Sequence, residues 1–287
     1  MRMDAECVPC LLGRVLYETR LCLPDKKEEV MEECLKVLCR EFRPGVNSAQ
    51  VATRVHKRAY ELLCSDPYKD LKKKSNLAAA SLLERAKDFV SKSKDRLEAA
   101  CLCSIAGNVL DFGIRMSVER PDAFADAFDS IIAQGLNVND VQSMRKILEE
   151  AERIVYLFDN CGEIIFDKLL IEEVKSFGTK VTGVVKGKPI LTDATWEDAV
   201  ETSVASILDK LETTGMFAIG VDVSRLNPFL RKQFEDADLI ISKGMANFEA
   251  LSDCSFAPVA YILRAKCRPV AHAIGANIND NVVRVVL

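Results

Sequence analysis

The chain has 287 residues and 49% of them are hydrophobic, which is enough for one large α/β domain or for two unequal domains. Its 39 Lys and Arg residues and 43 Asp and Glu residues give a net charge of -4. No segment concentrates enough basic charge to follow a nucleic-acid backbone, so we expect no nucleic-acid partner.

Residues 1–20 do not resemble a signal peptide, because acidic residues precede a short apolar run. No apolar stretch is long enough to cross a bilayer, so we expect no membrane partner. Eleven cysteines are spread through segments with helical periodicity, which fits buried thiols in a reducing compartment better than disulfides. The sequence therefore predicts a cytoplasmic protein, in which only Cys7 and Cys10 have a chemically suggestive spacing.

The first half of the chain reads as successive helices, because apolar residues recur three and four apart and Pro or Gly falls mainly between the segments. Asn47 or Ser48 can cap the third helix. The periodicity predicts helices at 8–22, 26–42, 48–64, 67–93, 95–115, 121–134 and 139–151. We therefore expect an all-helical part over residues 1–150.

The pattern changes at Arg153, where a β-prone run precedes an amphipathic segment at 163–177 and a second β-prone run at 180–185. Strand, helix and strand in this order predict parallel strands with a right-handed crossover. Further strands are predicted near 216–221, 238–242, 259–263 and 281–286, with helices near 224–236 and from Asn247. Residues 151–287 are thus predicted to form a Rossmann-like α/β domain with an open, mainly parallel sheet.

Polar side chains follow three of the predicted strands, at the end where open α/β sheets bind ligands. They are Asp159, Asn160 and Glu163 after the first strand, Asp193 after the second, and Lys243 and Asn247 after the strand at 238–242. Carboxylates, amides and a lysine without a histidine favour a hard cation such as magnesium or manganese over zinc.

Asp159 and Asn160 are adjacent at a corner between strand and loop, and Gly162 makes it easier for both to turn toward one ion. An ion with open coordination positions could bind phosphate oxygens and activate water, and Lys243 could add a cationic contact. For each position alone the alternatives are an ordinary turn at Asp159 and Asn160, a helix cap at Asp193 and a solvated Lys243.

At these residues the sequence resembles the DUF89 family of damage-control phosphatases, related to the ARMT1-like proteins, and in particular its archaeal subfamily I members. The similar stretches follow the family's order over nearly the whole chain. They are CVPC at 7–10, DPYKDLKKKSN at 66–76, AGNVLDFG at 106–113, FDNCGEIIFDKLLIEEV at 158–174, VVKGKPILTDATWEDA at 184–199, ISKGMANFEAL at 241–251 and YILRAKCRPVA at 261–271.

The resemblance implies hydrolysis of small phosphomonoesters with divalent manganese, nickel, cobalt or magnesium, by a helical part packed on a Rossmann-like domain. It implies that Asp159, Asn160 and Asp193 hold the metal. The residues that it places on the substrate side are Glu163, Lys243, Asn247 and Lys266. The chain departs from the family pattern at Cys161, where Ala is usual, and at Met245 and Ala246, where Gln and Gly are usual.

Two pairs in the helical half are open to more than one interpretation. Asn108 and Asp111 would share a helix face, either as a buried polar pair or helix end, or as residues that close the pocket over the substrate. The CxxC motif of Cys7 and Cys10 resembles that of subfamily I. One pair cannot complete a four-ligand zinc site, so we expect a structural role or an accessory metal contact.

Two other functions stay open: an S-adenosylmethionine-dependent carboxyl methyltransferase, although the glycine-rich loop after the first strand is missing, and a non-catalytic nucleotide- or metal-binding protein. Residues 183–189 resemble a Walker loop but are one residue short between the glycines, so we do not expect a phosphate loop. His56 and His272 lack the Ser or Cys context of a catalytic triad, and we expect packing or surface roles for both.

Overall fold

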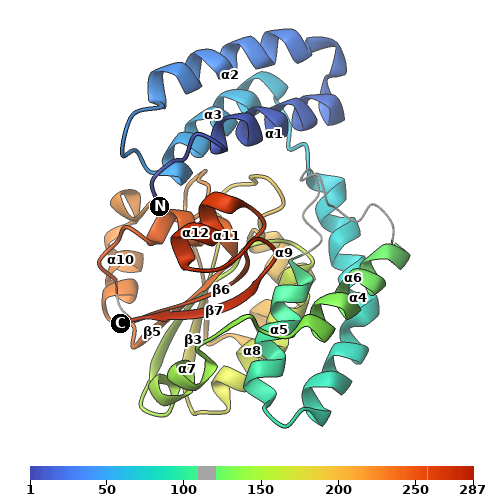
Figure 1. Cartoon of the computed structure of the whole chain (residues 1–287), viewed down its shortest axis with the longest axis vertical. Helices are drawn as coiled ribbons and strands as arrows, with labels where there is room; N and C mark the ends of the chain where they lie inside the picture. Colours follow the sequence, from blue (N-terminus) through green and yellow to red (C-terminus); the bar gives the residue numbers. More distant parts are fainter. Residues whose placement is uncertain (109–120, 257) are drawn as a thin grey trace.

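The computed structural model describes residues 1–108, 121–256 and 258–287. Figure 1 shows three N-terminal helices together at one end of the molecule, above an open sheet with helices on both of its faces. The N-terminus lies between the three helices and the sheet, and the C-terminus lies at the far end of the last strand. The fold is therefore mixed α/β, as predicted.

Helices occupy most of the first half of the chain, and most of them agree with the predicted ones to within a few residues. The helix predicted at 95–115 ends at Gly107, and the rest of that prediction lies largely outside the described residues. The helices are α1 (Cys7–Cys22), the 3-10 helix η1 (Pro24–Lys26), α2 (Lys27–Glu41), α3 (Ser48–Leu63), α4 (Lys69–Lys92), α5 (Arg96–Gly107), α6 (Pro121–Gln134) and α7 (Val141–Leu148). Asn47 caps α3 by accepting from the N–H groups of Ala49 and Gln50. No helix in the described part of the chain is long and apolar enough to span a bilayer.

In the described part of the chain the sheet has seven strands in the order β1-β7-β6-β5-β2-β3-β4, and among them only β6 and β7 pair antiparallel. The strands are β1 (Val138–Asn139), β2 (Arg153–Leu157), β3 (Lys180–Val185), β4 (Lys210–Thr213), β5 (Leu239–Lys243), β6 (Val259–Arg264) and β7 (Asn281–Val286). The helices and 3-10 turns between and after them are α8 (Glu163–Lys175), α9 (Trp196–Glu201), η2 (Val204–Ile207), η3 (Val223–Arg225), α10 (Pro228–Glu235), α11 (Gly244–Leu251) and α12 (Arg268–Ile274).

One predicted strand was wrong, and one helix begins two residues later than predicted. The strand predicted at 216–221 is irregular, and the edge strand is β4 instead. In segment 216–221, the apolar residues Met216, Ala218 and Val221 are buried in a hydrophobic core without pairing in the sheet. Their apolar pattern therefore resembles that of a strand. The helix predicted from residue 139 begins at Val141, because the two residues of β1 pair with β7.

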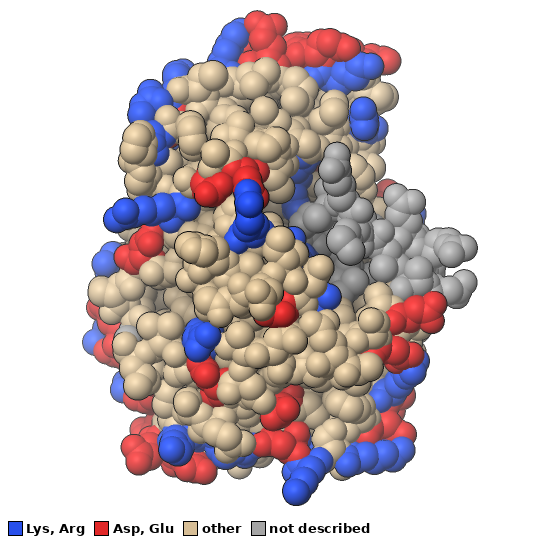
Figure 2. All heavy atoms as spheres, in the orientation of Figure 1, with Lys and Arg blue, Asp and Glu red and all other residues tan. Residues whose placement is uncertain are grey.

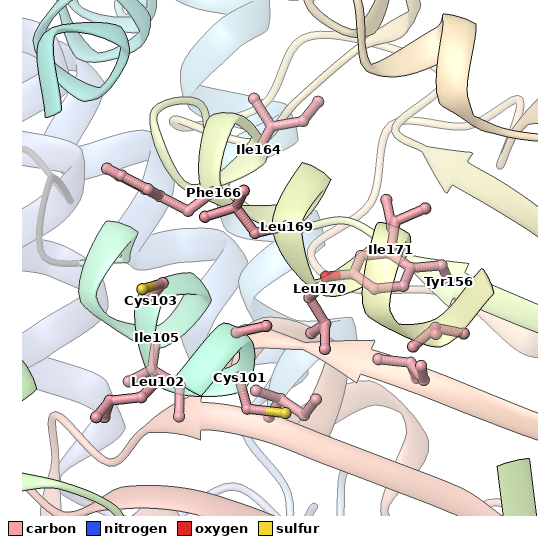
Figure 3. Close-up of a cluster of buried hydrophobic side chains, with 14 of the residues drawn as sticks. Cys101, Leu102, Cys103, Ile105, Tyr156, Ile164, Phe166, Leu169, Leu170 and Ile171 are labelled. Atoms are coloured by element: carbon pink, nitrogen blue, oxygen red, sulfur yellow. The ribbon is translucent and has the colours of Figure 1, made fainter. Parts of the chain in front are cut away.

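Alternate residues of β2 enter cores on opposite faces of the sheet, as expected for a central strand. Ile154 and Tyr156 belong to the core that contains α5 and α8, whereas Val155 and Leu157 belong to the core under α10, α11 and α12. Figure 3 shows side chains of α5 and α8 interleaved in the first of these cores. The core of α5 is thus continuous with that of the sheet.

Helices α1, α2 and α3 have a core of their own, which includes Val15, Val30, Val37 and Val55. We call these three helices the cap. The cap stands over one end of the sheet (Figure 1). The division of the chain at residue 150 stays a prediction, because α4 and α5 pack on α8 rather than on the cap.

Candidate metal and substrate site

Asp159 and Asn160 follow β2 directly, at the carboxyl end of a central parallel strand. The chain then turns at Gly162, whose φ of +82° favours glycine, and α8 begins at Glu163. This turn keeps both polar side chains at the strand end instead of letting the strand continue. Asp159 and Asn160 are 4% and 6% exposed, so the corner is buried.

Asp193 is brought to the same corner by backbone pairing. Asn160 and Asp193 form an isolated antiparallel bridge, and the N–H of Ala194 donates to the carbonyl of Asp159 over 2.8 Å. Asp193 does not cap the following helix, because Thr195 is the N-cap of α9. The three residues predicted to hold a metal therefore lie side by side.

The chemistry of these three side chains fits a hard divalent cation. They supply two carboxylates and one amide, and in the described part of the chain no three His, Cys, Asp or Glu side chains form a metal-binding cluster. The amide of Asn160 donates to Asp159 Oδ2 over 2.7 Å and accepts from Thr192 Oγ1 over 2.6 Å. A rotation of this amide by 180° would exchange its oxygen and nitrogen, so that the oxygen lies beside Asp159 and the nitrogen donates to Thr192 Oγ1. The amide oxygen could then be the third oxygen ligand of a metal ion.

Gly244 makes room for the Asp159 carboxylate. It follows β5 with φ +72°, and a Cβ at this position would lie 1.8 Å from Asp159 Oδ2. Both its conformation and the space beside it therefore require glycine. The end of β5 thus shapes the site although it supplies no ligand.

A buried charged network supports Asp159 from α5, α8 and β5. Asn108 donates to Asp159 Oδ2 over 3.0 Å and also to Glu163, while Lys243 Nζ contacts Glu163 and lies 3.1 Å from Asp167 Oδ1. Burial raises the pKa of Glu163 to about 7, although Lys243 acts in the opposite direction. Burial lowers the pKa of Lys243, but the two carboxylates outweigh this and raise it.

Lys243 is thus an internal ion-pair partner rather than the solvated lysine of the alternative interpretation. Sequence reasoning missed Asp167. It lies four residues after Glu163 on α8 and shares its helix face, and that spacing was the available signal.

Lys186 is a second residue that sequence reasoning missed. It is 2% exposed, and its Nζ donates to Gly220 O over 2.8 Å and to Asn247 Oδ1 over 3.1 Å, and lies 3.4 Å from Asp193 Oδ2. Asn247 in turn donates to Phe158 O over 3.0 Å. The available signal was its position directly after β3. In the comparison with a Walker loop, the glycines of this segment and not Lys186 were the informative residues.

A cavity of about 230 Å³ opens at this corner, between the cap and the α/β domain. Asp159, Asn160 and Asp193 form one part of its wall, and Met245 and Ala246 form another. The cap contributes polar side chains from α1 and α3. They are Cys7, Cys10, Arg14, Ser48 and His56.

The predicted substrate-side residues fall into two groups. Asn108 and Lys266 line the cavity, and Lys266 Nζ donates to the backbone carbonyl of Asn108 over 2.6 Å. The others are buried and, among the described residues, lie outside the cavity lining. They are Glu163, Lys243 and Asn247. Asp111 lies outside the described residues.

The CxxC motif begins α1 at the edge of the cavity. Cys7 is half-buried and Cys10 is exposed, and both line the cavity. Burial raises the pKa of the Cys7 thiol to about 11, so this thiol is not activated as a nucleophile. The structural or accessory role of the pair stays a prediction.

Comparisons with known proteins identify the family of the chain. Residues 3–282 match the model of the damage-control phosphatase ARMT1-like domain. A protein of Archaeoglobus fulgidus named damage-control phosphatase is 42% identical over 289 aligned positions, which cover 100% of both chains. An uncharacterised protein of Methanocaldococcus jannaschii is 35% identical over 99% of this chain and 95% of its own.

Two further matches come from Pyrococcus horikoshii. A damage-control phosphatase of this organism is 28% identical over 96% of this chain and 94% of its own. The crystal structure of a DUF89 family protein superposes with a TM-score of 0.89 and 27% identity, over 99% of both chains. The chain belongs to the damage-control phosphatase ARMT1-like family.

Proposed function

We propose that this protein is a metal-dependent phosphatase that hydrolyses small phosphomonoesters, such as sugar phosphates, damaged nucleotides or cofactor-related metabolites. The observation that carries the proposal is the convergence of Asp159, Asn160 and Asp193 in one buried corner that opens to a cavity. Carboxylate and amide oxygens at the carboxyl ends of parallel strands suit a divalent cation and a phosphate group.

We propose that these three side chains hold the ion. A bound divalent ion supplies positive charge for the phosphate oxygens and lowers the pKa of a bound water. Oxygen ligands favour magnesium or manganese, whereas the order of intrinsic affinities favours nickel and cobalt at the same site.

Other residues of the chain position these ligands. Asn108 fixes one carboxylate oxygen of Asp159, and Lys186 faces the carboxylate of Asp193. Lys266 lines the cavity and is our candidate for a direct contact with the substrate phosphate. We assign Glu163, Lys243 and Asn247 to the support of the corner, since they are buried.

The cavity supports a small metabolite as the substrate. Its volume of about 230 Å³ is below the range of roughly 300–1,000 Å³ that is usual for drug-sized ligands. On the face shown in Figure 2, acidic and basic side chains are interspersed. We also propose a cytoplasmic location, since all eleven cysteines are free thiols.

The test is hydrolysis of p-nitrophenyl phosphate by metal-stripped protein, with magnesium, manganese, cobalt or nickel added back. We expect activity only with metal, and a loss of at least about a hundredfold in Asp159→Ala. Asp88→Ala is the matched control, because Asp88 is an exposed carboxylate on α4 away from the cavity. Isothermal titration with the same ions should show weaker binding in Asp159→Ala only.

Other outcomes would overturn the proposal. Folded protein that binds the ion but does not hydrolyse any phosphomonoester in a substrate screen would indicate a binding protein. Methyl transfer from S-adenosylmethionine without added metal would indicate the methyltransferase. Activity that survives in Asp159→Ala would place the site elsewhere.

A further inference from the structure

The cap helix α3 is attached to the α/β domain through two side chains on one face. Thr53 Oγ1 accepts from the N–H of Ile219 over 2.9 Å, and Tyr60 Oη accepts from the N–H of Leu191 over 2.9 Å. These two residues are seven apart, so they lie on the same side of the helix. His56 lies between them at helical spacing and therefore faces the α/β domain, where it lines the cavity.

His56 is held in one orientation by Glu18 of α1. Its Nδ1 lies 2.9 Å from one carboxylate oxygen of Glu18 and 3.1 Å from the other, and the two side chains are 1% and 0% exposed. An ionised carboxylate can only accept, so Nδ1 carries the hydrogen in this pair. Nε2 lies on the opposite side of the ring from this contact, and it is an acceptor when the ring is neutral.

The second ring nitrogen of His56 has no role in the pair with Glu18. No hydrogen bond joins Nε2 to any residue in the described ranges. The cavity that His56 lines has apolar side chains such as Leu11 and Leu191 and polar ones such as Arg14. A ring nitrogen that has no partner in the described part of the protein and belongs to a residue of the cavity wall can take its hydrogen bond from a ligand.

We propose that His56 is a specificity-determining residue, which accepts a hydrogen bond at Nε2 from a hydroxyl group on the organic part of the substrate. Glu18 acts through His56 as a positioning residue, because it fixes the ring and its tautomer. The inference rests on the proposed phosphatase function and deepens it. It places the recognition of a hydroxylated leaving group on the cap, whereas the phosphate is handled by the α/β domain.

The variant His56→Asn tests this assignment. An asparagine amide can still donate to Glu18 from near the Nδ1 position, but it has no atom near the Nε2 position. We expect kcat/KM for glycerol phosphate and for hexose phosphates to fall by about tenfold, the size of one neutral hydrogen bond. For p-nitrophenyl phosphate, which has no hydroxyl group, we expect a change of less than about threefold.

The matched control is His272→Asn, which removes the second histidine of the chain at an exposed position on α12. An equal loss for all substrates in His56→Asn, or no loss for any, would overturn the assignment and indicate packing alone. If the wild-type protein hydrolyses no phosphomonoester at all, the proposed function fails instead.

A second measurement does not depend on activity. Because the chain has two histidines, nitrogen-15 NMR of the imidazoles can be assigned with the His272→Asn variant alone. We expect the signals of His56 to show hydrogen on Nδ1 and an unprotonated Nε2. Hydrogen on Nε2 would remove the acceptor and overturn the inference.

Discussion

Gly244 and Asp159 show how one missing side chain defines the site. The φ of +72° at Gly244 strains any other residue, and a Cβ would collide with the Asp159 carboxylate at 1.8 Å. We expect Gly244→Ala to displace Asp159 and lower activity by about a hundredfold, and to destabilise the fold by about 1–3 kcal/mol. Metal-dependent hydrolysis and urea denaturation measure the two effects.

Gly13→Ala is the control for this change. Gly13 lies within α1 and a Cβ there would meet nothing within 4 Å. The variant should keep full activity and gain up to about 1 kcal/mol in stability, because Ala favours the helix more than Gly does. Full activity in Gly244→Ala would mean that Asp159 does not need its present position.

Lys186 supplies positive charge to Asp193, and Lys186→Met removes it with little change in volume. The variant leaves a carboxylate buried without its cation, so we expect a loss of about 3 kcal/mol in stability and of at least about tenfold in activity. A divalent ion at Asp193 would replace part of the missing charge. The stability loss measured by urea denaturation should therefore be larger in chelator than in magnesium.

Lys188→Met is the comparison, since Lys188 is exposed two residues further along the same loop. Lys188→Met should change neither the stability nor the activity measurably. A stability loss in Lys186→Met that is the same with and without metal would argue against ion binding at Asp193.

The sequence located the proposed metal-binding residues better than the residues that support them. Asp159 and Asn160 could be predicted because they directly follow a recognisable strand. Asp167 and Lys186 had only weak local signals, namely the four-residue spacing from Glu163 and the position directly after β3. The roles of both, and that of His56, depend on partners on other elements. Burial of a charged side chain depends on the partner that neutralises it, and the partner is known only after folding.

At the scale of elements, α4 and α9 are joined by a buried ion pair. Lys72 Nζ lies 2.6 Å from Asp198 Oδ2, and Asp198 also closes the capping box of α9 with Thr195. Burial raises the pKa of Asp198, but the charge and hydrogen bond of Lys72 outweigh it and lower the pKa below 3.8. The pair therefore contributes stability above the ordinary pKa of Asp.

We expect Lys72→Met to destabilise the fold by about 3 kcal/mol at neutral pH, because it leaves Asp198 buried without its partner. The difference from the wild type should shrink as the pH falls through the lowered pKa of Asp198, where the carboxylate gains a proton. Urea denaturation between pH 7 and pH 3 measures this. Lys73→Met, at an exposed position on the same helix, should have little effect at any pH.

Elements were predictable where one periodicity dominates. The long helices and the buried strands β2, β3 and β5 agree with prediction because their apolar residues repeat every 3.6 residues or run continuously. The segment 216–221 was misread because its apolar residues serve a loop core, and β1 was missed because two residues carry no pattern. The apolar pattern of a segment indicates that its side chains are buried, but it does not indicate which other element buries them.

At the scale of the whole molecule, the sequence predicted a helical half and an α/β half, but it did not predict which helices pack on the sheet and which form the cap. Helices α4 and α5 pack on α8 as part of the α/β core, while α1, α2 and α3 form the cap (Figure 1). The cap closes the cavity through contacts between residues more than a hundred positions apart. Such contacts leave no trace in sequence spacing.

Hydrogen exchange of the two backbone N–H groups that donate to Thr53 and Tyr60 can measure how often the cap opens. The amide hydrogens of Leu191 and Ile219 are shielded only while α3 stays in place, so their exchange with deuterated water requires the cap to lift. If the cap moves as one body, both amides should exchange at one rate, and a bound metal and phosphate should slow both together. Unequal rates would show that α3 peels from one end, and the faster amide would mark the side by which substrates enter.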